Sequence, residues 1–116
     1  MEQKKAIRAF AEKWLDRLSR GEGKTLTGQE LGQDCRRLGF SMDCGRSFEA
    51  VYGVAVYDGE ALEKVVSRIR DPMLLGSAIY SRWRYWSYWA YMPEDILSQE
   101  KWFRLALGRL GELGED

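Results

Sequence analysis

The sequence predicts an all-α domain, a compact bundle of five to six helices packed around a Trp/Tyr-rich central helix at about residues 73–92. Three observations support this fold class. Five segments place apolar side chains at the spacing of one helix face. Four of these segments begin at residues that commonly cap helices. The stretch 73–92 also holds three of the five tryptophans and four of the six tyrosines, and such large rings are usually buried.

The first predicted helix covers residues 3–20. Gly21 and Gly23 follow it, and glycine commonly ends helices. Charged side chains occupy one side of this segment. The apolar side chains recur on the other side, at Ile7, Phe10, Ala11, Trp14, Leu15 and Leu18.

The second predicted helix opens with a capping box. Thr27 supplies the cap and Glu30 reaches back to it three residues later. The helix runs to about Leu38, and Gly39 ends it. Its apolar stripe consists of Leu31, Cys35 and Leu38.

Two shorter helices are predicted before the central one. One covers about 43–52 and is stopped by Gly53, and 54–57 is interpreted as an extended connector. Asp58 begins the next helix, whose apolar stripe follows the helical spacing without a break. That stripe consists of Leu62, Val65, Val66 and Ile69.

The central helix begins at Asp71 and Pro72, because proline suits a first helical turn. A turn of about 100° per residue places every tryptophan of this helix on one side, and most tyrosines and serines on the other. We expect the tryptophan side to face the core. Arg82 lies in the middle of that side, where a guanidinium needs a partner.

Pro93 is expected to end the central helix, and Ser98 to cap the last one. Glycine recurs at every third position near the end of this last helix. These glycines either admit a close backbone contact or weaken the helix end, and we expect fraying after Leu110. The predicted shared core consists of Trp14, Phe48, Leu62, Val66, Ile79, Trp83, Trp86 and Phe103.

Composition narrows the function classes. The 116 residues form one predicted domain, 1–116, with 18 basic and 18 acidic residues. Zero net charge gives no general attraction to nucleic acid. The chain has no histidine, which excludes histidine-based catalysis. Its two cysteines fit no zinc spacing, so no cofactor, metal or catalytic residue is predicted. Each thiol is expected to be a small buried apolar group.

Arg82 is expected to form a structural pair with a carboxylate. Asp34 is the first candidate and Glu49 the second, because each lies near the apolar stripe of its own helix. Two alternatives remain open. Arg82 could line a pocket for an anionic ligand, or its stem could lie along aromatic surface with the charge in water.

The predicted function is that of a protein-binding or regulatory module, with an unknown protein partner and a cytoplasmic location. Tyrosine and arginine are enriched at binding hot spots, and the outer side of the central helix carries Tyr80, Arg84, Tyr88 and Tyr91. A second layer of helices covering this side is the competing interpretation. A membrane span is rejected because Arg82 and Arg84 interrupt the stretch.

Two other function classes carry less weight. The segment 82–86 alternates basic and aromatic residues, as single-strand binding surfaces do, which suggests a nucleic-acid-binding accessory protein. Against that class stand the zero net charge and the inward position of Arg82 and Trp86. The last class is a small enzyme without histidine chemistry, but no pair of groups at catalytic spacing supports it.

Overall fold

The computed structural model describes residues 2–22, 29–40, 53, 63–89 and 93–114. These residues are helical apart from short turns and connections, which confirms the predicted all-α fold class. The elements are α1 (Glu2–Ser19), α2 (Gln29–Arg37), the 3-10 helix η2 (Val66–Arg68), α5 (Pro72–Trp89) and α6 (Pro93–Leu113).

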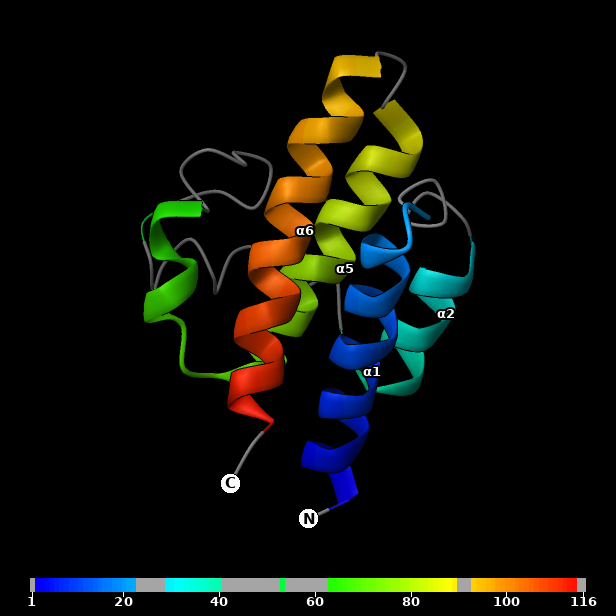
Figure 1. The fold of residues 1–116 in the computed structure, drawn as a ribbon. Helices are drawn as coiled ribbons and strands as arrows, with labels where there is room; N and C mark the ends of the chain where they lie inside the picture. The colour runs from blue at the N-terminus through cyan, green and yellow to red at the C-terminus, as the bar shows by residue number, and fades with distance from the viewer. Residues whose placement is uncertain (1, 23–28, 41–52, 54–62, 90–92, 115–116) are drawn as a thin grey trace.

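Two long antiparallel helices, α5 and α6, form the centre of the bundle (Figure 1). α1 runs antiparallel to α6 and packs along it, while α2 packs on α5 and η2 packs on the other side of α6. The radius of gyration is 12.9 Å, close to the value of about 13 Å expected for a compact domain of this length.

The core is built from the apolar stripes that the sequence predicts. Trp14, Ile79 and Phe103 are fully buried in one cluster, and Trp83 joins them with 5% exposure. Val66 is also buried, but it lies outside this cluster, in contrast to the prediction. Phe48 and Leu62 lie outside the described residues, as does the side chain of Trp86, so those three core assignments stay predictions.

Two glycines end α1 and α2 in the way that the sequence predicts. Gly21 and Gly39 adopt positive φ values of 77° and 82°, a conformation that glycine tolerates without steric cost. The amide of Glu22 donates to the carbonyl of Arg17, and the amide of Phe40 donates to that of Cys35. This pattern is the Schellman motif, in which each helix's last carbonyls are satisfied as the chain turns away.

The start of α5 is confirmed and the start of α6 is not. The Asp71 carboxylate accepts hydrogen bonds from the amides of Met73 and Leu74, at 3.0 and 3.4 Å, and so caps α5. Pro93 opens α6, so Ser98 lies inside that helix and does not cap it. The prediction treated Pro93 only as a stop, whereas proline is equally suited to a first helical turn.

The end of α6 is also corrected. The helix continues past Leu110 to Leu113, and Gly114 is buried against α1. A Cβ at Gly114 would lie 3.0 Å from the Arg8 Cβ and 3.1 Å from the Lys4 carbonyl oxygen. Close backbone approach, the alternative to fraying, is therefore what the glycine at 114 provides.

Two further glycines allow α2 and α5 to pack closely. A Cβ on Gly32 of α2 would overlap the indole ring of Trp83. A Cβ on Gly76 of α5 would overlap the ring of Phe40, the residue that follows the end of α2. Each glycine thus forms the flat surface on which an aromatic ring of the partner element lies.

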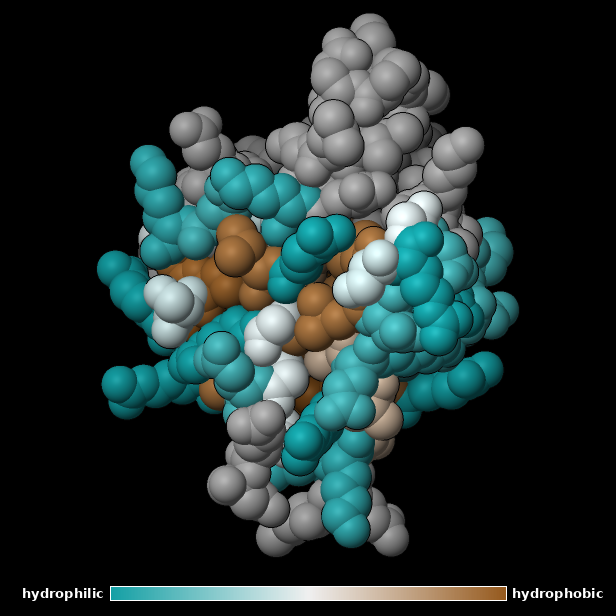
Figure 2. Space-filling model, in the orientation of Figure 1, coloured by the Kyte–Doolittle hydropathy of each residue, from teal (hydrophilic) through white to brown (hydrophobic). Residues whose placement is uncertain are grey.

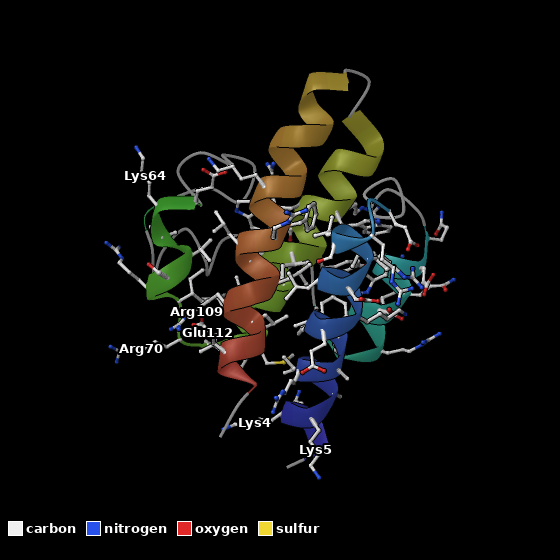
Figure 3. All side chains as sticks on the ribbon, in the orientation of Figure 1. Lys4, Lys5, Lys64, Arg70, Arg109 and Glu112 are labelled. Carbon is white, nitrogen blue, oxygen red and sulfur yellow. The ribbon has the colours of Figure 1, made fainter. Side chains whose placement is uncertain are left out.

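Arg109 fastens the connection between η2 and α5 onto α6. Its Nε donates to the carbonyl of Ile69 at 2.9 Å, and its terminal nitrogen pairs with Glu112, also at 2.9 Å. Figure 3 shows both side chains on α6 beside that connection. Within the described part of the chain, no helix is apolar and long enough to cross a membrane.

Candidate functional site

The carboxylate of Asp34 on α2 is in contact with three polar side chains. The whole residue is 8% exposed, and its carboxylate accepts hydrogen bonds from the Lys13 ammonium at 2.6 Å and from the Trp14 indole at 3.1 Å, both on α1. Arg37, one turn further along α2, adds a contact of 3.2 Å. Buried carboxylates need such compensation, and here it joins the two helices.

Glu30 extends this network toward solvent. Arg17 grips its carboxylate with two parallel hydrogen bonds of 2.8 Å each, the bidentate geometry that makes arginine pairs strong. Lys13 contacts the same carboxylate at 2.7 Å. The guanidinium of Arg17 also lies 4.6 Å from the ring centre of Trp14, within cation–π range.

The network shifts the pKa values of Glu30 and Lys13. Hydrogen bonds from Arg17 and then Lys13 lower the pKa of Glu30 to about 2. Burial alone would lower the pKa of Lys13, but its hydrogen bonds to Asp34 and Glu30 outweigh burial and raise it. Both changes favour the charged forms, which keeps the ion pairs intact near neutral pH.

The low pKa of Glu30 predicts acid-dependent stability. The folded value of about 2 lies below the unfolded value of about 4.3, so ionised Glu30 stabilises the fold above pH 4.3, roughly, and this contribution disappears as the pH falls toward 2, roughly. In Glu30→Gln this dependence should be absent. Chemical denaturation at several pH values measures it. A difference in the free energy of unfolding between wild type and Glu30→Gln that stays constant from neutral pH down to acid would contradict the assignment.

A hollow of about 350 Å³ opens between α1 and α2 beside Asp34. Its apolar lining comes from Phe10 and Leu38, and from two small exposed residues of α1, Ala6 and Ala9. Lys13, Asp34 and Arg37 complete it. We call this set of seven residues the α1–α2 groove. Its volume lies within the range of about 300–1,000 Å³ typical of ligand pockets.

A second hollow of about 300 Å³ lies between η2 and α6. Its lining includes Val66, Gly108 and Leu105, whose exposure is 44%. Figure 2 shows apolar surface over these elements, bordered by hydrophilic side chains. Four ionisable residues also line this hollow: Glu63, Arg104, Arg109 and Glu112. It is therefore more polar than the α1–α2 groove, and single exposed leucines are common on protein surfaces.

The exposed surface predicted on the outer side of α5 does not include Tyr80. Tyr80 is only 7% exposed, its ring stacks on Trp83, and its hydroxyl accepts a 3.0 Å hydrogen bond from Arg36. Burial removes Tyr80 from the candidate partner-binding residues. Arg84 is exposed as predicted. The side chain of Tyr88 and all of Tyr91 lie outside the described residues.

Both sides of α5 are buried in its first part. Ser77 and Ser81, on the side predicted to face outward, are 4% and 5% exposed. This part of the side predicted to face outward is therefore covered, and α2 contributes to the cover through the hydrogen bond from Arg36 to Tyr80. The burial of Arg82 and Trp83 also keeps them from acting as a stacking surface for nucleic acid.

Arg82 is buried as predicted, with 4% exposure, and its guanidinium lies 5.6 Å from the ring centre of Trp102 on α6. Asp34, the first predicted partner, has the α1–α2 contacts described above instead of a contact with this residue in the described structure. Glu49, the second, lies outside the described residues. The aromatic contact is one that helical spacing alone could not identify.

The different surroundings of Arg82 and Arg84 predict different responses to lysine. Arg82→Lys should destabilise the protein, because lysine lacks the planar group that fits a buried aromatic contact. Arg84→Lys should be nearly neutral, since this side chain is exposed. Thermal unfolding of the two variants gives the comparison, and equal melting temperatures would contradict a structural role for Arg82.

Cys35 confirms the expectation of a buried thiol. It is fully buried, and burial, followed by the adjacent Asp34 carboxylate, raises its pKa. A protonated, inaccessible thiol is a poor nucleophile. Cys44 lies outside the described residues.

Sequence reasoning missed the α1–α2 groove. Lys13 and Arg17 were assigned to the solvent face of the first helix. Their four-residue spacing matches that of Glu30 and Asp34, and this was the available signal for pairing between the helices. The small side chains of Ala6 and Ala9 were a weaker indication that α1 lines a groove.

A scan against protein-family models gave no match for this chain. Searches of curated proteins and of solved structures gave none either.

Proposed function

We propose that this protein is a protein-binding module that receives an apolar side chain of a partner protein in the α1–α2 groove. The observation that carries this proposal is the mainly apolar hollow of about 350 Å³, open beside a fixed set of charges. Binding hot spots typically place a large anchor side chain in such a pocket, surrounded by polar groups.

The groove is supported by aromatic packing and by ion pairs between α1 and α2. Phe10 contributes to its lining and packs edge-to-face on Phe40, with ring centres 5.8 Å apart. The ion pairs of Lys13 with Asp34 and of Arg17 with Glu30 join α1 to α2. A preformed groove loses little conformational entropy when a partner binds, which favours affinity.

Neutral helical peptides that differ only in one central residue test the proposal. Peptides with Trp or Leu at that position should shift the backbone amide resonances of Ala6, Ala9 and Leu38 in an NMR titration. The peptide with Ala should not, because it offers no anchor. If all three peptides leave these resonances unchanged, the groove is not a binding site for an apolar anchor.

A filled groove provides the matched control. Ala9→Trp places a large ring at the groove and should abolish the resonance shifts. Ser19→Trp introduces the same residue at an exposed position of the same helix, and should leave binding unchanged. Equal binding to both variants would place the peptide elsewhere on the protein.

A further inference from the structure

The charges of the α1–α2 groove differ in how far they reach solvent. The Asp34 side chain is 11% exposed, whereas that of Lys13 is 37% exposed and that of Arg37 is 75% exposed. A molecule that enters the groove therefore meets Arg37 as the most exposed charge at its edge. Asp34 lies deeper, and Lys13 is held by the carboxylates of Asp34 and Glu30.

The carboxylate of Asp34 already accepts hydrogen bonds from within the protein. Its two oxygens accept from Lys13, Trp14 and Arg37, out of about four lone-pair sites on a carboxylate. The contact between Arg37 and Asp34 uses one of the five N–H donors of the guanidinium. The remaining donors of this largely exposed side chain can meet a carboxylate from outside.

From this arrangement we infer that the partner segment is acidic, with an Asp or Glu side chain beside the apolar anchor that pairs with Arg37. The inference rests on the proposed function, because it requires an anchor in the groove. Arginine binds carboxylates in a bidentate geometry, which would fix the orientation of the segment across α1 and α2. Exposed pairs of this kind are screened by salt, so they should contribute more to selectivity than to affinity.

Two charged forms of the Trp-anchored peptide test the inference, one with glutamates beside the anchor and one with lysines. Fluorescence anisotropy at low salt should show the glutamate peptide binding about tenfold more tightly than the lysine peptide. The difference should shrink as salt is raised. Arg37→Glu should remove or reverse the preference.

Lys64→Glu is the matched control, because it makes the same charge change at an exposed residue near η2, on the opposite side of α6 from α1 (Figure 3). It should leave the preference unchanged. Binding of both charged peptides with equal affinity would contradict the inference that the partner is acidic. It would not contradict the proposal that an apolar anchor binds in the groove. Failure of the neutral Trp peptide to bind would instead overturn the proposed function.

Two other anionic binding partners are tested beside the peptides. Vesicles containing phosphatidylserine and a single-stranded oligonucleotide should each bind no more tightly than the lysine peptide. Stronger binding of either one, lost in Arg37→Glu, would overturn the assignment to a protein segment.

Discussion

Trp14→Ala should lower the free energy of unfolding by about 3–5 kcal/mol. The Trp14 side chain is fully buried and its indole N–H donates to Asp34. Removal leaves a cavity between α1 and the rest of the core, and it takes a hydrogen bond from the carboxylate that joins α1 to α2. Because small domains are stable by only about 5–15 kcal/mol, this one change should consume a large part of the total.

Chemical denaturation measures the effect. Trp14→Phe should fall between wild type and Trp14→Ala, since it keeps an aromatic ring but loses the donor and part of the indole volume. Leu105→Ala is the control for loss of apolar atoms at an exposed position, because Leu105 is 44% exposed, and should cost less than about 1 kcal/mol. A similar loss for Trp14→Ala and Leu105→Ala would show that Trp14 does not occupy the core.

Gly76→Ala and Gly108→Ala should change stability in opposite directions. Alanine is favoured over glycine inside a helix by about 1 kcal/mol. At Gly108 the added methyl group meets no atom within 4 Å, so the variant should gain about 0.5–1 kcal/mol. At Gly76 the same group would overlap the Phe40 ring, and overpacking should cost about 1–3 kcal/mol.

A double-mutant cycle tests the cause of the loss at Gly76. Phe40→Leu should weaken the clash, so the double variant should be more stable than the sum of the two single losses implies. Thermal unfolding of the four proteins gives the coupling energy. Additive losses would mean that the ring of Phe40 is not what excludes a side chain at Gly76.

Helix positions were predictable because they depend on local patterns. The buried stripe of α1, from Ile7 to Leu18, is visible as apolar spacing in the sequence. Gly39 and Asp71 mark helix ends through their own backbone and side-chain chemistry. Pro93 was misinterpreted because proline can precede or open a helix, and the residue alone does not distinguish the two.

The α1–α2 groove was not predictable in the same way. Its residues come from α1, from α2 and from the turn that follows α2, and no local pattern in the sequence indicates that α1 and α2 are neighbours. In the folded protein, Asp34 forms its ion pair with Lys13 of α1. Arg82, for which Asp34 was the predicted partner, contacts the ring of Trp102 on α6. The packing roles of Gly32 and Gly76 were not predicted for the same reason. Each glycine is required by an aromatic ring from another element, and the sequence does not indicate which ring that is.

The packing of α1 along α6 has a consequence for how the chain folds during synthesis. The first described helix, α1, packs along the last one, α6, so α1 cannot make its full set of contacts until residues 93–113 have left the ribosome. Contacts between distant segments require a large loop to close first, which costs entropy and slows folding. Until then α1 exposes an apolar stripe, and a nascent chain of this kind is a natural substrate for chaperones.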